Sequence, residues 1–125
     1  MAIIGIGTDI VEIARIERQL QKSSRLAQRV LTDTELAEWS AHPFPNRFLA
    51  KRFAAKEATV KAFGTGIGHG VSFKQMEIRH YDSGQPYLYL SGYLRQLTEE
   101  RSITGSHISI ADEKHYAVAT VVLEK

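Results

Sequence analysis

Phe53-Ala-Ala-Lys56-Glu57-Ala58-Thr-Val-Lys61-Ala62-Phe63-Gly64 is the stretch that decides the fold. At 3.6 residues per turn, Phe53, Glu57 and Lys61 follow one stripe of a helix. We expect Pro45 to begin this helix and Gly64 to end it with a left-handed cap. The pattern alone favours a structural i,i+4 pair between Glu57 and Lys61. Charged groups at the edge of an apolar stripe nevertheless also indicate a site.

Length and composition indicate one compact domain. The chain has 125 residues, of which 43% are hydrophobic and 24% charged, so it can bury a core but cannot form two domains. The absence of cysteine excludes disulfides, thiolate catalysis and cysteine-based zinc sites. Residues 2–6 lack the basic start of a leader peptide, and no apolar run approaches the length of a membrane span. We therefore expect a cytoplasmic protein without a membrane partner.

The positive charge is gathered in two segments, although the net charge is only +2. The first contains Arg15, Arg18, Lys22, Arg25 and Arg29, and the second contains Arg47, Lys51, Arg52, Lys56 and Lys61. Each segment includes a single acid, Glu17 or Glu57. Such segments are typical of an anionic partner, which could be a nucleic acid, a phosphorylated small molecule or an acidic protein. A solvated basic face explains either segment about equally well.

Residues 3–11 predict a strand that ends in a turn near Asp9. Gly5 and Gly7 resemble the start of a dinucleotide-binding fingerprint, but position 10 is isoleucine where a third glycine is needed. The two glycines instead allow another backbone or a ligand to approach closely. On the pattern alone, Asp9 is best interpreted as the cap of the next helix.

The rest of the chain predicts an α+β domain. Apolar spacing indicates helices at 12–22 and 26–31, and Thr32 and Glu35 form the capping box of a third helix. Strands are expected at 71–81 and 86–90, a helix at 92–101, and a final hairpin of strands at 106–111 and 115–123. In that hairpin His107 shares a face with small residues, so it could reach a ligand or lie half-buried. Segment 64–70 lacks the order of a phosphate-binding loop, which favours a mobile connector.

Two segments together resemble the signature motifs of a known family. Gly5-Ile-Gly7-Thr-Asp9-Ile-Val and the stretch from Phe53 to Gly64 are similar to the motifs of holo-acyl-carrier-protein synthases, the small bacterial 4'-phosphopantetheinyl transferases. The resemblance covers essentially the whole chain and implies one domain, residues 1–125, of antiparallel strands packed on a long helix. The implied reaction transfers the phosphopantetheine arm of coenzyme A to a serine of apo-acyl carrier protein. It releases adenosine 3',5'-bisphosphate and supports fatty acid biosynthesis.

The same resemblance implies roles for individual residues. Asp9 and Glu57 match two carboxylate ligands of Mg²⁺, whose other positions are left to water and phosphate oxygens. Lys61 matches a lysine beside the pyrophosphate, and either Glu57 or a water held by the metal would accept the serine proton. Lys56 would contact phosphate or only anchor the helix. Contacts with coenzyme A are further implied for Gly64, Thr65, Gly66 and His107.

The resemblance also implies partners. Because acyl carrier proteins are acidic, the first basic segment (Arg15, Arg18, Lys22, Arg25 and Arg29) becomes a docking surface that acts mainly on the association rate. A homotrimer is expected, with active sites at the subunit interfaces, so Asp9, Glu57 and His107 need not belong to one chain. Nucleic acid is not an expected partner. Two alternatives remain: a small basic nucleic-acid-binding domain, which leaves both carboxylates without a role, and an interaction module without activity.

Overall fold

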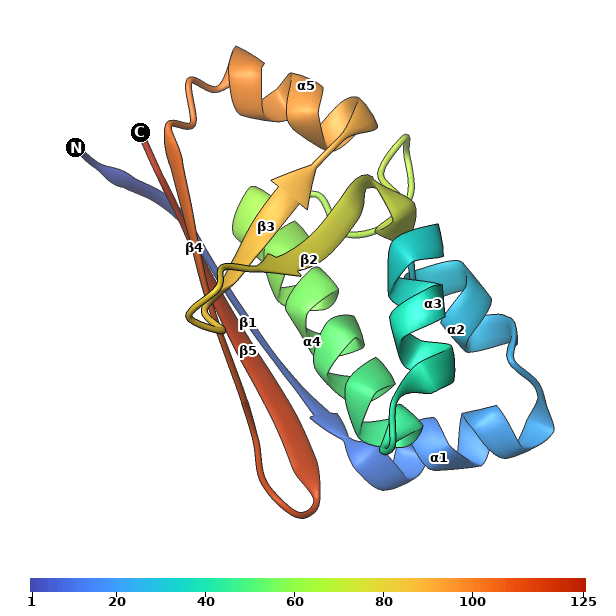
Figure 1. Cartoon of the computed structure of the whole chain (residues 1–125). Helices are drawn as coiled ribbons and strands as arrows, with labels where there is room; N and C mark the ends of the chain where they lie inside the picture. Colours follow the sequence, from blue (N-terminus) through green and yellow to red (C-terminus); the bar gives the residue numbers. More distant parts are fainter.

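The computed structural model describes all residues from Met1 to Lys125 (Figure 1). The strands are β1 (Ile3–Glu12), β2 (Met76–His80), β3 (Pro86–Leu90), β4 (Gly105–Asp112) and β5 (Tyr116–Glu124). The helices are α1 (Ile13–Lys22), α2 (Arg25–Val30), α3 (Asp33–Ala41), α4 (Pro45–Phe63) and α5 (Gly92–Glu100), and a 3₁₀ turn, η1, spans Phe73–Gln75. This is the α+β class that the sequence predicts. No helix combines the length and apolar character that crossing a membrane requires.

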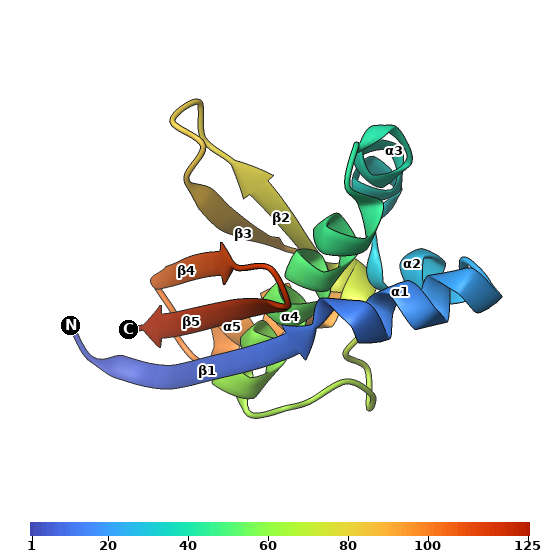
Figure 2. The same ribbon diagram turned by 90° about the horizontal axis from the view of Figure 1, so that it is seen from below.

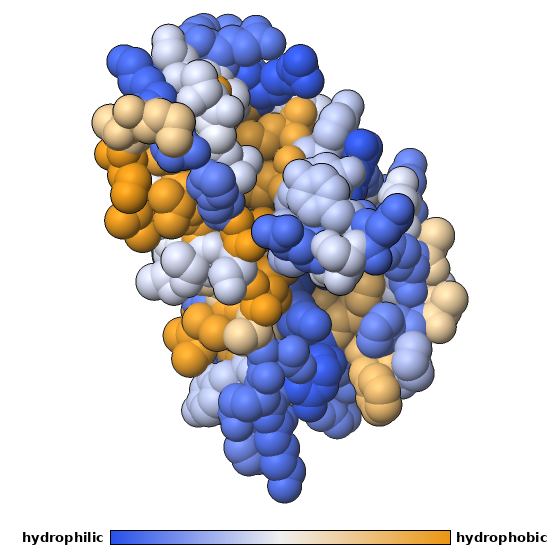
Figure 3. All heavy atoms as spheres, turned by 60° about the vertical axis from the view of Figure 1, so that its left-hand side comes forward, coloured by the Kyte–Doolittle hydropathy of each residue, from blue (hydrophilic) through white to orange (hydrophobic).

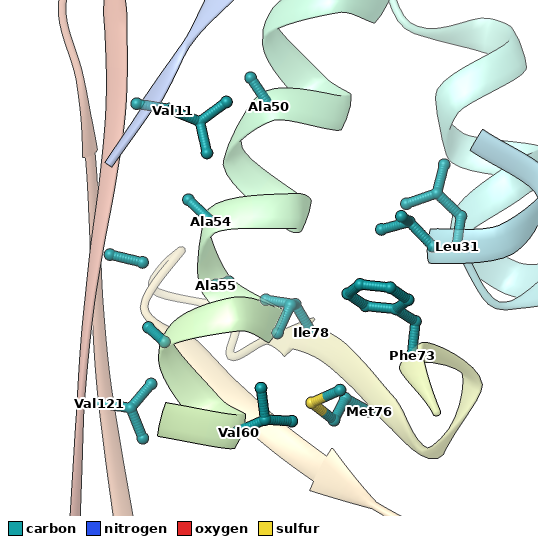
Figure 4. Packing of buried hydrophobic residues seen from close by; sticks show 14 of the residues in the cluster. Val11, Leu31, Ala50, Ala54, Ala55, Val60, Phe73, Met76, Ile78 and Val121 are labelled. Atoms are coloured by element: carbon teal, nitrogen blue, oxygen red, sulfur yellow. The ribbon is translucent and has the colours of Figure 1, made fainter. Parts of the chain in front are cut away.

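Helix α4 is the centre of the molecule and is buried on nearly every side. Pro45 lies in its first turn, and Gly64 ends it in the left-handed conformation with φ 75°, as predicted. Many of its buried residues are alanines, so neighbouring elements can approach its backbone closely. Figure 4 shows Val121 of the sheet on one side of α4, and Phe73 and Ile78 on the other.

Strands β1, β5 and β4 form an antiparallel sheet, in that order, against one side of α4 (Figure 1). Two glycines of β1 permit this contact. A Cβ atom on Gly5 would lie 2.1 Å from the carbonyl oxygen of Ala62, and one on Gly7 would lie 1.9 Å from that of Ala58. The prediction that these glycines admit another backbone is confirmed, and that backbone belongs to α4.

The predicted end of β1 near Asp9 is wrong, because the strand continues to Glu12. Asp9 pairs with Ala119 of β5, and the residue before α1 is Glu12, so Asp9 does not cap that helix. The strand continues because β5 supplies partners as far as Tyr116. These partners lie more than a hundred residues along the chain and leave no mark in the local pattern.

The hairpin β2–β3 forms a separate two-stranded sheet that extends away from the first one (Figure 2). Its turn contains Gly84, with φ 90°. The strand expected at 71–81 forms only from Met76 onward, because residues 73–75 make the 3₁₀ turn. Gly68 and Val71 exchange backbone hydrogen bonds just before this turn, and the side chain of Phe73 enters the core, so the alternation of a strand is interrupted.

Helices α1, α2 and α3 lie on the side of α4 away from β4 and β5 (Figures 1 and 2). The two first helices begin and end within one residue of their predicted bounds. Helix α3 begins with the predicted capping box, in which the hydroxyl of Thr32 accepts from the Glu35 N–H and the Glu35 carboxylate accepts from the Thr32 N–H.

Candidate active site

Strand β1 and helix α4 bring Asp9 and Glu57 to one cleft. The strand runs past successive turns of the helix, with Gly7 beside Ala58. Residues two apart on a strand share one face, so Asp9 faces α4 as Gly7 does, and it contacts Lys61 there. The charge of Asp9 also acts on Glu57, the residue that precedes Ala58 in the helix. Both carboxylates line the cleft.

The cleft has a volume of about 710 Å³ and is bounded by β1, α1, α2 and α4. Its apolar lining consists of Ile10, Val11, Ile16, Leu26 and Phe53. Sequence reasoning did not assign this lining to the site, although Ile10 and Phe53 belong to the two motifs. Helix α1 adds a basic border formed by Arg15, Arg18 and Lys22. Acidic, apolar and basic surfaces thus meet in one place.

Burial and the negative charge of Asp9 raise the pKa of Glu57, and burial is the larger cause. The positive charges of Lys61 and Arg29 lower this pKa in part. The two carboxylates thus repel one another in a partly buried place, where a divalent cation would stabilise both. No histidine and no third acidic residue joins these two carboxylates in a metal-binding cluster. This donor set fits Mg²⁺, which uses one or two carboxylates and otherwise binds water and phosphate oxygens.

Lys61 pairs with Asp9, and the predicted helical pair between Lys61 and Glu57 is wrong. The Nζ atom of Lys61 lies 2.9 Å from Asp9 Oδ1 and donates to the carbonyl of Thr8 at 3.1 Å. The strand lies closer to the ammonium than the preceding helical turn does, because Gly7 brings the two backbones together. About half of the Lys61 side chain remains exposed, so a ligand can reach the ammonium.

Lys56 lies in the core and not in the cleft. Its side chain is fully buried, and its Nζ donates to Glu35 Oε1 at 2.5 Å and to the carbonyls of Val30 at 2.6 Å and Phe73 at 3.3 Å. All its donors are used, and none faces a place where a phosphate could bind. Of the two interpretations offered by the family resemblance, this position supports anchoring of the helix and contradicts a contact with coenzyme A.

Residues 64–66 form an exposed loop directly after the last turn of α4, beyond Lys61. The N–H groups of Thr65 and Gly66 both point to the carbonyl of Val60, at 3.1 and 3.4 Å. The space beside Gly64 and Gly66 is open, so a ligand could approach their backbone. These residues do not line the cleft that contains the two carboxylates.

His107 lies on the face of the sheet that points away from α4. It pairs across strands with Val122, and its Nε2 lies 2.8 Å from Glu124 Oε1. Asp9 faces the opposite side of the sheet, beside Lys61 of α4. One chain alone therefore does not bring His107 to the carboxylates.

All five basic residues of the first segment are exposed. The second segment is used inside the molecule and does not form another free basic face. Arg47 and Lys51 pair with Asp112 at 2.7 and 3.5 Å, while Arg52 and Lys56 lie beside the buried Glu35. Only one of the two basic segments is therefore free to meet a nucleic acid, which weakens that alternative.

Comparison with known proteins gives a uniform result. The family model described as the 4'-phosphopantetheinyl transferase superfamily matches residues 5–121. A holo-[acyl-carrier-protein] synthase of Pseudoalteromonas atlantica is 63% identical over 99% of this chain and 98% of its own length. The crystal structure of the holo-[acyl-carrier-protein] synthase from Neisseria meningitidis is 44% identical, with a TM-score of 0.93, over 99% of this chain and 100% of that one. A Bacillus anthracis holo-(acyl-carrier-protein) synthase in complex with CoA (3',5'-ADP) is 42% identical, with a TM-score of 0.80, over 97% and 96%.

Proposed function

Because this chain belongs to the 4'-phosphopantetheinyl transferase superfamily, we propose that it transfers the phosphopantetheine arm of coenzyme A to apo-acyl carrier protein in a Mg²⁺-dependent reaction. The cleft carries this conclusion, since Asp9 and Glu57 lie there beside the exposed basic helix α1. A site for a phosphate-bound metal thus adjoins a surface for an acidic protein. We place the reaction in the cytoplasm and in fatty acid biosynthesis.

The chemistry is a phosphoryl transfer with two products. The serine Oγ of the carrier protein forms a bond to the phosphorus that bears pantetheine, and the bond from this phosphorus to adenosine 3',5'-bisphosphate breaks. The serine loses its proton as it attacks. Such reactions depend mainly on in-line placement and on neutralisation of charge. The side chains of the cleft are suited to both.

Asp9 and Glu57 are the residues that would hold Mg²⁺. Their mutual repulsion and partial burial support this assignment. When bound, the ion would neutralise the negative charge of the pyrophosphate oxygens. The protein contributes only two carboxylates, which leaves room for phosphate oxygens and water.

Lys61 and Glu57 take the remaining chemical roles. The ammonium of Lys61 is mobile on its flexible stem and can turn from Asp9 toward the leaving phosphate, where it stabilises developing charge. Glu57, or a water beside it, would accept the proton that the serine loses as it attacks, because Glu57 lines the cleft where the serine must enter.

The exposed basic residues of α1 and α2 form the docking surface for the acidic carrier protein. This surface, the basic docking surface, consists of Arg15, Arg18, Lys22, Arg25 and Arg29. Three of these side chains border the cleft itself. A carrier protein bound there would present its serine to Glu57 from the open side of the cleft.

A homotrimer would complete the site. The outward face of the sheet carries Ile6 and Ile10, whose exposed fractions are 63% and 64%, and Figure 3 shows apolar side chains gathered on this side of the molecule. A second copy that covers this face would bring its own cleft to His107. Contacts of coenzyme A with Gly64, Thr65 and Gly66 from one chain and His107 from another then become possible.

Mass spectrometry of apo-acyl carrier protein tests this function directly. The carrier protein is incubated with this enzyme and coenzyme A, in Mg²⁺ or in excess EDTA. We expect the carrier protein to gain the mass of one phosphopantetheine arm in Mg²⁺ but not in EDTA. The Asp9→Asn variant should give no mass gain under either condition. A gain in EDTA would contradict the metal assignment, and no gain with any of several carrier proteins would favour the inactive interaction module.

A further inference from the structure

A buried ionic cluster of Glu35, Arg52 and Lys56 joins α3 and α4 and also contacts α2, η1 and β2. Glu35 and Lys56 are both fully buried, and Arg52 is 5% exposed, with its Nε 3.6 Å from Glu35 Oε2. Glu35 also accepts from the backbone N–H groups of Thr32 and Ile78, at 3.0 and 2.9 Å. The cluster therefore ties α4 to α3 and β2 through a single carboxylate. None of its members takes part in the proposed chemistry.

Lys56 connects the metal-site helix to the end of the short helix α2. Its Nζ donates to the carbonyl of Val30, which is the last residue of α2, and to that of Phe73 in η1. Lys56 immediately precedes Glu57 in α4, so the same helical turn carries the buried anchor and the cleft carboxylate. Figures 1 and 2 show α2 and α3 on the same side of α4.

Helix α2, which Lys56 contacts through Val30, also carries part of the basic docking surface. Arg29 belongs to α2, and its guanidinium lies 5.3 Å from the ring centre of Phe73. The ring of Phe73 in turn packs 5.8 Å from that of Phe53, which lines the cleft. Arg29 also lowers the pKa of Glu57 by its charge. The docking surface and the carboxylate site are thus joined through one layer of side chains.

Stability alone does not explain a buried ion pair at this place. Removing two charges from water costs several kcal/mol per ion, and well-packed apolar residues are often as stable as a buried pair. The pair differs from apolar packing in that its hydrogen bonds are directional. Each of them forms only with its partner at a defined distance and angle. Such a cluster fixes how far α2 and α3 lie from α4.

We propose that Lys56 and Glu35 are positioning residues that hold the α2 part of the basic docking surface, Arg25 and Arg29, in a fixed relation to the carboxylates of the cleft. This inference rests on the proposed transfer of phosphopantetheine to a carrier protein. The pair touches no substrate. It acts on the placement of the carrier-protein serine relative to Glu57, and therefore on the carrier-protein step rather than on coenzyme A binding.

The test is the double variant Lys56→Met with Glu35→Gln, which removes both charges and keeps an acceptor for the Ile78 N–H. Steady-state transfer is measured against carrier protein, coenzyme A binding by calorimetry and folding by thermal unfolding. We expect kcat/KM for carrier protein to fall about tenfold or more, because small misplacements are costly in such reactions, while coenzyme A affinity is retained. Thr59→Val is the matched control, since the buried Thr59 hydroxyl bonds only within α4; this variant should behave like the wild type.

Each outcome decides the question. A folded double variant with normal carrier-protein kinetics, or with equal losses for both substrates, overturns the positioning role. If the double variant does not fold, Lys56→Met alone, which leaves Glu35 beside Arg52 and bonded to the backbone N–H groups of Thr32 and Ile78, undergoes the same measurements. A selective loss for carrier protein then supports the role, and normal kinetics or equal losses overturn it. Wild-type enzyme without any transfer would instead refute the proposed function, so the two failures are distinguishable.

Discussion

At the residue scale, Asp9 and Lys61 act on Glu57 in opposite directions: the charge of Asp9 raises the pKa of Glu57 and the charge of Lys61 lowers it. The motifs were sufficient to select all three residues from the sequence. Their pairing could not be predicted, because the helical rule places Lys61 beside Glu57 whereas the strand places it 2.9 Å from Asp9. The role of Lys56 was equally hidden, since a lysine in a motif gives no sign of whether it faces a cleft or the core.

Glu57→Gln should stabilise the metal-free protein at neutral pH. The pKa of Glu57 is raised in the folded state by burial and by Asp9, so the native protein binds the proton more tightly than the unfolded chain does. Stability is therefore lost as pH rises above the ordinary glutamate value of about 4.3. Thermal unfolding in EDTA should show a higher Tm for the variant at neutral pH, and a difference that shrinks below pH of about 4. Equal Tm values at neutral pH would contradict the repulsion.

The Lys61→Met variant should bind a divalent cation more tightly than the wild type, although it should transfer phosphopantetheine more slowly. The ammonium beside Asp9 repels a cation at the same carboxylate, and its removal should improve Mn²⁺ affinity by up to about fivefold, since partly exposed pairs are worth up to about 1 kcal/mol. Calorimetry or electron paramagnetic resonance measures this without coenzyme A. Lys61→Arg retains the charge and serves as control. Weaker Mn²⁺ binding by the methionine variant would refute this repulsion.

At the scale of elements, the sequence predicted those helix ends that depend on interactions between neighbouring residues. Pro45, Gly64 and the capping box at Thr32 fix the ends of α4 and α3 through interactions within a few residues, and these bounds are confirmed. The continuation of β1 past Asp9 and the 3₁₀ turn at Phe73 depend on distant partners and on the core, so the sequence pattern misjudged both.

Gly7→Ala should destabilise the fold because β1 and α4 touch through their backbones. The added Cβ would lie 1.9 Å from the Ala58 carbonyl oxygen, a backbone atom that cannot rotate away. We expect a loss of about 1–3 kcal/mol or more in the free energy of unfolding, measured by urea titration. Gly105→Ala is the control, because its nearest neighbour is the flexible side chain of Glu124. Similar small losses for both would contradict the close approach.

Charge reversal on α1 and α2 should weaken the docking of carrier protein without a matching loss of coenzyme A binding. Arg15→Glu with Arg25→Glu should raise KM for the acidic carrier protein about tenfold or more and reduce its dependence on salt, because long-range attraction acts mainly on association. Coenzyme A affinity by calorimetry should change far less, because Arg25 lies outside the cleft and Arg15 only borders it. Lys114→Glu with Lys125→Glu, at two exposed positions outside this surface, changes the net charge by the same amount and is the control. Equal losses for both substrates would exclude this docking surface.

At the scale of the whole molecule, the sheet separates the parts of the site. Its inner face carries Asp9 against α4, and its outer face carries His107 beside Glu124 and an exposed apolar row that includes Ile6 and Ile10. No pattern within the sequence states which strand face meets another copy, so the trimer rests on family resemblance together with this exposed surface. A site shared between chains reconciles the two faces.

Mixing two inactive variants tests whether chains share a site. Asp9→Asn lacks a proposed metal ligand and His107→Ala lacks a proposed phosphate contact, so each alone should transfer poorly. If these residues act together across an interface, assemblies formed from both variants contain some sites with both residues intact, and transfer activity should reappear on mixing after dissociation and reassembly.

The control for this experiment changes the exposed apolar face of the sheet. Ile6→Lys, introduced into both variants, should prevent assembly in sedimentation and abolish the recovery, because a charge would have to be buried against a second chain. Phe44→Lys changes an equally exposed apolar residue away from the sheet and should leave both assembly and recovery intact. Two variants that are each inactive, assemble normally and show no recovery would contradict a site in which Asp9 and His107 come from different chains. Full activity of His107→Ala alone would show instead that His107 has no part in the chemistry of the cleft, as expected if only its own chain mattered, because it lies on the opposite face of its own sheet from Asp9.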